Sequence, residues 1–111
     1  MTYKPFSIVI VPFPFTDQNA VKRRPALVLS SVEHQRHTNH ITLMMITTAK
    51  KNAWWNDYPI KSLQSSGLPE HSIIRQKIVT LDSRLIIKSI GHLSEIDARA
   101  ITKLIKKHLE F

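Results

Sequence analysis

The first 30 residues constrain the fold more than any other part of this chain. An apolar, β-branched run at Ser7–Val11 leads through Pro12-Phe13-Pro14-Phe15, a polar loop and three cations into a second apolar run at Ala26–Ser30. Short β-branched runs bounded by proline and turn residues are typical of strands in a sheet. We therefore expect two strands joined by a loop at Thr16–Arg23. Pro12 and Pro14 are expected to end the first strand, because proline donates no N–H.

The remainder of the chain predicts further strands and one helix. Strands are expected at Ile41–Thr47, Ile73–Thr80 and Leu85–Ile90, with an edge strand at Asp57–Lys61 and a polar loop at Glu33–His40. Apolar residues from Ile96 to Leu109 recur at helical spacing behind a capping Ser94. The sequence thus predicts one domain over residues 1–111, a small, mainly β, partly open barrel with a C-terminal helix packed across it.

Composition restricts the location of the protein and its partners. The chain contains no cysteine, which excludes disulfides, thiolate metal sites and a cysteine nucleophile. No apolar run approaches the roughly 18 residues of a membrane span, and the first residues lack the long apolar core that a signal peptide would have. We therefore expect a soluble, cytoplasmic protein that does not associate with membranes. The net charge of +8 favours a polyanion or an acidic protein as its partner.

Three segments, in the right order, resemble the MazF/PemK toxins, which are the ribonuclease components of bacterial toxin–antitoxin pairs. The segments are the proline-rich strand end and Lys22-Arg23-Arg24-Pro25, then Ile46-Thr47-Thr48, and then Ser72 to Asp82. The resemblance runs from about Phe6 to the C-terminus. It implies the SH3-like barrel that these toxins share with the CcdB gyrase poisons.

The resemblance also implies an activity and partners. It implies a metal-independent, sequence-specific endoribonuclease that cuts single-stranded mRNA, needs no cofactor, and leaves a 2′,3′-cyclic phosphate and a 5′-hydroxyl. A homodimer with RNA in the groove between subunits is expected, as is a cognate antitoxin with an acidic tail. Two alternatives stay open: a CcdB-like noncatalytic gyrase poison, and a noncatalytic nucleic-acid-binding barrel or decayed toxin.

Arg24 is the first candidate for the reaction itself. An arginine fork pairs with two phosphate oxygens at once, and Pro25 biases Arg24 towards an extended backbone at a strand edge. The resemblance implies that Arg24 stabilises charge on the scissile phosphate. It further implies that Thr47 or Thr48 bonds a phosphate oxygen or orients the 2′-hydroxyl. Thr47 is preferred because it directly follows Ile46, the last apolar residue of the expected strand.

A second set of residues is expected to contact the RNA. Lys22 and Arg23 lie beside Arg24, and Arg75 and Lys77 share one strand face by alternation. Trp54, next to Trp55, offers a stacking face for an unpaired base, while one ring of the pair is expected to be buried. Asp17 completes the set and offers a carboxylate from the loop.

The groups that would move protons are the least determined part of the site. PemK-type toxins carry an Asp shortly after the residue that matches Arg75, whereas this chain has Gln76, which does not exchange protons near neutral pH. Histidine titrates near working pH, which makes His34, His37, His40 and His71 candidates. The spacing of these histidines matches no zinc motif, so no metal is expected.

Overall fold

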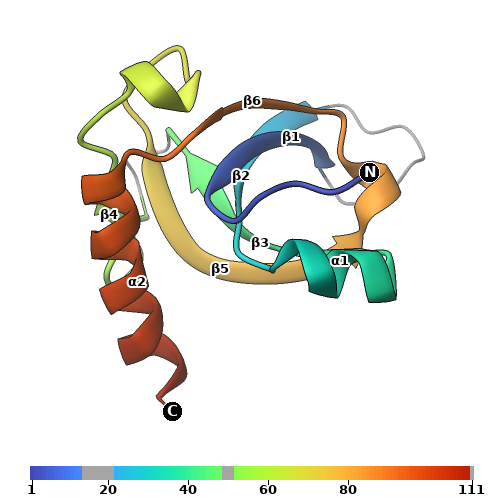
Figure 1. The fold of residues 1–111 in the computed structure, drawn as a ribbon. Helices are drawn as coiled ribbons and strands as arrows, with labels where there is room; N and C mark the ends of the chain where they lie inside the picture. Colours follow the sequence, from blue (N-terminus) through green and yellow to red (C-terminus); the bar gives the residue numbers. More distant parts are fainter. Residues whose placement is uncertain (14–21, 49–51, 111) are drawn as a thin grey trace.

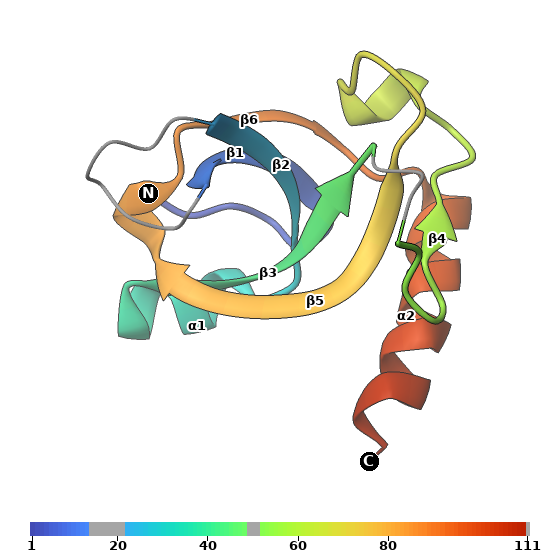
Figure 2. The ribbon, with the colours of Figure 1, turned by 180° about the vertical axis from the view of Figure 1, so that it is seen from behind.

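Six strands form one curled, antiparallel sheet in the order β4-β5-β3-β2-β1-β6. The computed structural model describes residues 1–13, 22–48 and 52–110. The elements are β1 Ser7–Phe13, β2 Lys22–Val28, α1 Val32–Thr38, β3 His40–Thr47, β4 Tyr58–Pro59, β5 Ile73–Asp82, β6 Lys88–His92 and α2 Glu95–Leu109. Figure 1 shows the sheet curled into a half-barrel with α2 along one side, and Figure 2 shows the same arrangement from behind. The expected mainly β half-barrel with a C-terminal helix is confirmed.

The alternation of side chains along the strands divides the core into two clusters. Val9, Ala26 and Met45 belong to the cluster on one face of the sheet. Leu27 and Met44 belong to the cluster on the other face, where α2 contributes the fully buried Ile101. Because successive strand residues point to opposite faces, each inner strand buries both of its sides.

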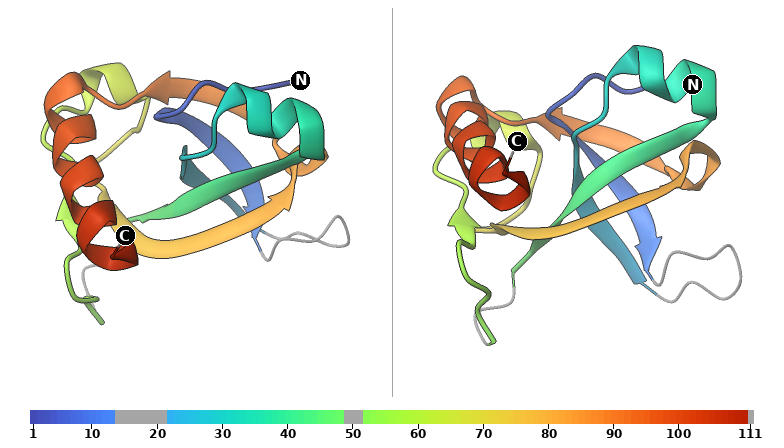
Figure 3. Two further views of the ribbon diagram at one scale, coloured as in Figure 1. Left: turned by 60° about the horizontal axis from the view of Figure 1, so that its bottom comes forward. Right: turned by 90° about the horizontal axis from the view of Figure 1, so that it is seen from below.

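Helix α2 confirms the helix that the apolar periodicity predicts. The Ser94 hydroxyl accepts a hydrogen bond of 3.2 Å from the backbone N–H of Asp97, which caps the first turn. The cations Lys106 and Lys107 lie in the last turn, where they complement the helix dipole. Figure 3 shows α2 on one side of the half-barrel and α1 on the other. Neither helix in the described part of the chain is long and apolar enough to cross a membrane.

The expected loop at Glu33–His40 is wrong, because Val32–Thr38 forms α1. The hydroxyl of Ser31 accepts from the backbone N–H of His34 at 3.0 Å and caps the helix, and Asn39 ends it in a left-handed conformation. Only Gln35 is buried in this helix. A helix that buries a single polar side chain has no apolar stripe from which sequence could predict it.

The strand boundaries at the N-terminal hairpin also differ from expectation. Strand β1 continues through Pro12, which pairs with Arg23. The pairing of β1 with β6 reaches only to Ile10, so Pro12 lies on a free strand edge, where a missing N–H is tolerated. Strand β2 begins at Lys22 rather than at Ala26, so its cations lie on the strand itself.

Strand β6 begins later than expected, at Lys88. The carboxylate of Asp82 accepts a hydrogen bond of 2.9 Å from the backbone N–H of Arg84, and this cap starts a 3-10 turn over Ser83–Leu85. The turn occupies residues that the apolar pattern assigns to the strand.

The expected edge strand is present as the short β4, which pairs with β5. The backbone N–H of Ile60 donates to the carbonyl of Ser72, the residue that precedes β5, so alternation turns the nitrogen of Pro59 away from the sheet. Proline therefore stands at the position of β4 where a missing N–H leaves no ladder bond unmade.

Candidate functional site

A cavity of about 330 Å³ lies where β2 begins and β3 ends. It is lined by Lys22, Arg23, Arg24 and Pro25 from β2 and by Ile46, Thr47 and Thr48 from the end of β3. Ala26 pairs with Met45 in the antiparallel register. Arg24 lies two residues before Ala26 and Thr47 lies two residues after Met45, so the two side chains lie towards the same face of the sheet. The structure thus brings together Arg24, both threonine candidates and two of the expected RNA contacts.

The electrostatics of this cavity favour an anion. Among the described residues that line it, three side chains are cationic and none is acidic. The side chain of Arg24 is partly buried, and its strand neighbours Val11 and Ala26 are fully buried. A charge beside an apolar surface is screened less than one in bulk water, so Arg24 can act strongly on a phosphate placed in the cavity. The threonine hydroxyls add neutral hydrogen-bond donors.

Arg75 is engaged within the protein. Its guanidinium donates to both carboxylate oxygens of Asp57, at 3.2 Å from Nε and 3.0 Å from Nη2. The side chains of this ion pair are only 14% and 10% exposed. Lys77, on the same strand, is exposed. Of the two β5 cations expected to contact RNA, therefore, only Lys77 presents its charge to solvent.

The tryptophan pair does not divide into one buried and one exposed ring, because it lies in a turn rather than a strand. Trp54 is 46% exposed and packs beneath the guanidinium of Arg75, whose carbon lies 5.4 Å from the ring centroid. Trp55 is 82% exposed. The sequence assigned the RNA contact to Trp54, whereas the structure presents Trp55 more fully to solvent. Asp17 lies outside the described residues.

Gln76 is buried and is held by contacts with two other parts of the protein. Its side chain is 8% exposed; its amide nitrogen donates to the carbonyl of Asn56 at 3.3 Å, and its oxygen lies 2.8 Å from Nδ1 of His108 on α2. Gln76 therefore joins a turn to the C-terminal helix. Nothing in these contacts gives it a part in proton transfer.

The register separates the histidine candidates. His34 and His37 lie on α1 and His40 begins β3, whereas Thr47 ends that strand. A strand of this length spans about 23 Å, so within one chain these three histidines are remote from the cavity. His71 lies two residues before Ile73, whose Cα pairs with that of Thr47. His71 is therefore the candidate at the cavity's end of the sheet. Among the described residues, no group of three or more His, Asp or Glu side chains could hold a metal ion.

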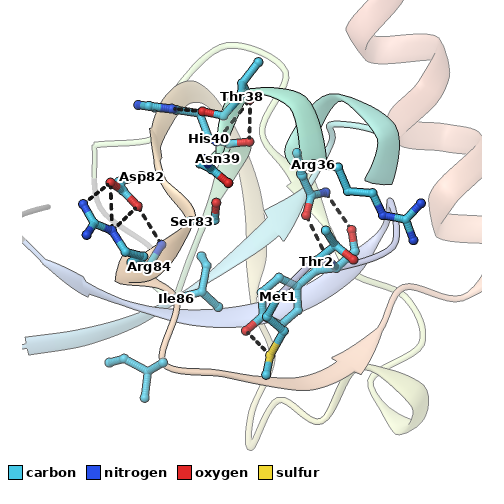
Figure 4. A pocket seen from close by; sticks show the side chains of 13 residues that line it. Met1, Thr2, Arg36, Thr38, Asn39, His40, Asp82, Ser83, Arg84 and Ile86 are labelled. Atoms are coloured by element: carbon cyan, nitrogen blue, oxygen red, sulfur yellow. Dashed lines mark hydrogen bonds and ion pairs between the residues drawn. The ribbon is translucent and has the colours of Figure 1, made fainter.

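A second cavity, of about 950 Å³, lies at the opposite end of β3 (Figure 4). Its charged and polar side chains are largely bonded to one another. Arg84 donates hydrogen bonds to Asp82 and lowers the pKa of that carboxyl to about 2. His40 Nδ1 lies 2.8 Å from the carbonyl of Thr38, and Gln35 bonds both the N–H and the carbonyl of Tyr3. The bonds from Gln35 hold the N-terminal segment against α1.

A mostly apolar groove of about 690 Å³ lies between the end of α2 and the sheet. Phe6, Ile78, Ile105 and Leu109 are among the residues that line it, with Lys106 also present. Leu109 is 45% exposed. The groove therefore presents mostly apolar surface.

Sequence reasoning missed Asp57 and Trp55. Asp57 was read as the start of a strand, although Asn-Asp next to a tryptophan pair is turn chemistry and was a usable signal. Trp55 could not be separated from Trp54 without the turn geometry.

A curled sheet, a C-terminal helix and a cationic cavity with threonine hydroxyls make up a small half-barrel with a site that suits a phosphate. Residues 4–109 match the family model described as PemK-like, MazF-like toxin of type II toxin-antitoxin system. The chain therefore belongs to this toxin family, as its sequence resemblance predicts.

Solved structures share the fold along the whole chain. MazF from Deinococcus radiodurans superposes with a TM-score of 0.76 at 17% identity, covering 100% of this chain and 99% of its own. The Mycobacterium tuberculosis toxin MazF-mt6 gives 0.74 at 21% identity, with 95% and 97% covered. A mycobacterial endoribonuclease solved with its cognate antitoxin gives 0.76 at 14% identity, with 99% and 95% covered. No curated protein sequence matches the chain.

Proposed function

We propose that the chain is a metal-independent, sequence-specific endoribonuclease that cuts single-stranded RNA and acts as the toxin of a toxin–antitoxin pair. The observation that carries this proposal is the cavity in which Arg24 and Thr47 meet, with Lys22 and Arg23 at its rim. A partly buried arginine, hydroxyl donors and two further cations are the groups that a phosphodiester requires. Messenger RNA would be met in the cytoplasm, which is the proposed place of action.

The proposed reaction is an internal transfer at phosphorus. The RNA 2′-oxygen attacks the adjacent phosphorus and loses its proton to a base, while the bond from phosphorus to the 5′-oxygen breaks and that oxygen takes a proton. The products are a 2′,3′-cyclic phosphate and a 5′-hydroxyl. Arg24 pairs with the non-bridging oxygens as their charge grows, and Thr47 or Thr48 bonds one of them or orients the 2′-hydroxyl. His71 is the nearest histidine candidate for a proton-transfer role.

The other residues that were expected to contact RNA are proposed to hold the RNA strand near the cavity. Lys22 and Arg23 are exposed beside the cavity, and Lys77 is exposed on β5, so all three can meet backbone phosphates. Single strands suit this arrangement because their bases can splay out and be read by the protein. Asp17 stays in the proposed set, and Arg75 is proposed to act through the turn that it holds.

The proposed protein partner is a cognate antitoxin with an acidic tail. Two related toxins were solved as complexes, one with its cognate antitoxin and one as MazE–MazF from Deinococcus radiodurans. The +8 net charge of this chain complements such a tail, which would order on binding.

The chain is further proposed to act as a homodimer. The apolar groove beside Ile105 and Leu109 is a surface that a second copy can bury, since removal of apolar area from water drives association. Light scattering during size-exclusion chromatography measures the mass directly. A dimer that Leu109→Asp dissociates would place the groove in the interface, whereas a monomeric wild-type protein would refute the dimer.

The test of the activity is incubation of the purified protein with a long single-stranded RNA in EDTA, with cut sites and end groups mapped. Arg24→Ala should reduce cleavage about a hundredfold or more, because a transition-state cation is lost. Arg36→Ala removes an exposed arginine of α1 at the other end of β3 and should leave cleavage unchanged.

Each outcome of this test discriminates. Recurrent cuts that leave 5′-hydroxyl ends and disappear with Arg24→Ala support the nuclease. An intact RNA from a folded wild-type protein overturns it, and toxicity that survives Arg24→Ala then favours a gyrase poison. RNA that is bound but uncut favours a noncatalytic binding barrel or a decayed toxin.

A further inference from the structure

The turn at residues 52–57 is held to β5 by hydrogen bonds and by a cation–π contact. Arg75 donates to Asp57 and also to the carbonyl of Asn52, at 3.4 Å. Gln76 donates to the carbonyl of Asn56, and the guanidinium of Arg75 packs against the Trp54 ring. Two neighbouring strand residues thus fix four members of the turn.

The turn is closed on itself as well. The backbone N–H of Asp57 donates to the carbonyl of Trp54 at 3.2 Å, and the Asp57 carboxylate accepts from the N–H of Trp54 at 3.0 Å. Asn56 has a left-handed φ of 63°, as the third residue of a type II turn requires, and Asn tolerates it. Trp55 occupies the second position, at the tip.

Trp55 is 82% exposed at this fixed position. A tryptophan left in water contributes little to folding, because the gain from burial is forgone. Holding it rigidly, however, lowers the entropy lost when a ligand stacks on it. An exposed indole on a rigidly held turn is therefore suited to binding a ligand.

The location of the turn ties it to the cationic cavity. Asn52 follows Thr48 by four positions, so their Cα atoms lie no more than about 15 Å apart. The strand residue that braces the turn, Arg75, pairs with Met45 of β3, which is two residues from Thr47. A few nucleotides of single-stranded RNA can span this separation, with exposed Lys77 on the same strand as Arg75.

From these observations we infer that Trp55 is a stacking platform for an unpaired nucleobase of the RNA, close to the nucleotide that occupies the cavity. The inference rests on the proposed function and deepens it. Trp54, Asp57 and Arg75 are positioning residues that keep the Trp55 indole outward. Stacking uses the π-face common to all bases, so Trp55 contributes affinity more than sequence choice.

The chain itself supplies the reporters for a test, because Trp54 and Trp55 are its only tryptophans. In Trp54→Phe, which keeps a ring beneath Arg75, all tryptophan fluorescence comes from Trp55. The probe is a single strand of mixed sequence that carries 2′-O-methyl groups throughout, which cannot be cut because it lacks the attacking hydroxyl. We expect this probe to quench the fluorescence of Trp54→Phe strongly and that of Trp55→Phe weakly.

Affinity for the same probe gives the second readout. Trp55→Ala should weaken binding by about 5- to 100-fold, and Trp55→Phe should restore most of the loss. Ile96→Ala, which truncates a 67% exposed apolar side chain on α2, is the matched control and should leave binding unchanged. Circular dichroism of each variant establishes that it is folded.

The failures are distinguishable. Suppose that the wild-type protein cuts ordinary RNA, that Trp55→Ala binds the probe as tightly as the wild type, and that the probe does not quench Trp54→Phe. This result overturns the Trp55 inference and leaves the proposed nuclease activity intact. No binding and no cleavage by the wild-type protein removes both. Unchanged RNA affinity combined with lost affinity of Trp55→Ala for the antitoxin assigns the indole to a protein partner and also overturns the inference.

Discussion

The carboxylate of Asp97, in the first turn of α2, accepts a hydrogen bond of 2.6 Å from the hydroxyl of Tyr58 in β4. Asp97 is fully buried and also accepts from the backbone N–H groups of Lys61 and Ser62, at 3.2 and 3.0 Å, and from the hydroxyl of Ser94. One side chain therefore anchors the helix to the edge strand and to the segment that follows it. The position of α2, and with it the contact from His108 to Gln76, depends on this anchor.

Asp97→Asn should lower the free energy of unfolding by about 2–4 kcal/mol, because an amide nitrogen cannot accept the hydrogen bonds that one carboxylate oxygen accepts. Urea denaturation measures the change. Glu95→Gln, in the same turn but exposed, is the control and should cost less than about 0.5 kcal/mol. Equal effects of the two substitutions would contradict the anchor.

Stability should fall in acid through the same residue. Burial acts to raise the pKa of Asp97, but the hydrogen bonds from Tyr58, Ser62, Lys61 and Ser94 outweigh it and hold the pKa below its ordinary 3.8. The unfolded chain therefore takes up the proton first as the pH falls, so this contribution is present above pH 3.8 and is lost below it. Urea denaturation midpoints measured as a function of pH should show this loss of stability in the wild-type protein and not in Asp97→Asn.

Alkaline conditions should weaken the protein through Tyr58. Burial, the hydrogen bond to Asp97 and the charge of that carboxylate together raise the pKa of Tyr58 to about 12 from 10.0. A raised pKa gives stability that is complete below pH 10 and is lost as the pH rises towards 12. Tyr58→Phe should flatten this part of the stability profile. An unchanged slope would mean that other groups cause it.

Thr47→Val should reduce the cleavage rate about tenfold to a hundredfold, since it keeps the shape of the side chain but removes the hydroxyl that the proposed reaction bonds to a charged phosphate. Thr48→Val is the matched partner, because Thr48 is exposed and follows the end of β3. A larger effect at Thr48 in single-turnover cleavage would transfer the proposed role to that residue.

His71→Asn should lower kcat about a hundredfold or more and remove one limb of the pH–rate profile, if His71 moves a proton in the proposed reaction. His40→Asn is the control, because His40 begins β3 at the end remote from the cavity. A profile that keeps both limbs in His71→Asn would exclude the histidine and direct attention to the loop that contains Asp17.

The sequence predicted the elements whose signal is apolar periodicity and missed those made by polar contacts. Strand β3 and helix α2 each bury apolar residues at a regular spacing, so their pattern is visible in the letters. Helix α1 depends on the hydroxyl of Ser31 and on one buried amide, Gln35, which bonds the backbone of Tyr3, 32 residues away. Such long-range pairing leaves no local pattern.

The residues of the candidate site also fall into two groups, those that the sequence could predict and those that it could not. Arg24 and Thr47 were assigned to one site from motifs in register, and the pairing of β2 with β3 brings them to one cavity. The bonding partners of Arg75 and Gln76 could not be predicted, because alternation predicts which face of the strand a side chain lies on but not which residue it contacts. Asp57 neutralises the first, and His108 binds the second.

Pro59 has a consequence for the behaviour of the protein in concentrated solution. An exposed strand edge is a template on which other chains can add, and this route leads to aggregates. On β4 the outward nitrogen carries no hydrogen, so an incoming strand would find a donor missing from a two-residue edge. The outer border of the sheet at β4 is thereby protected against growth by strand addition.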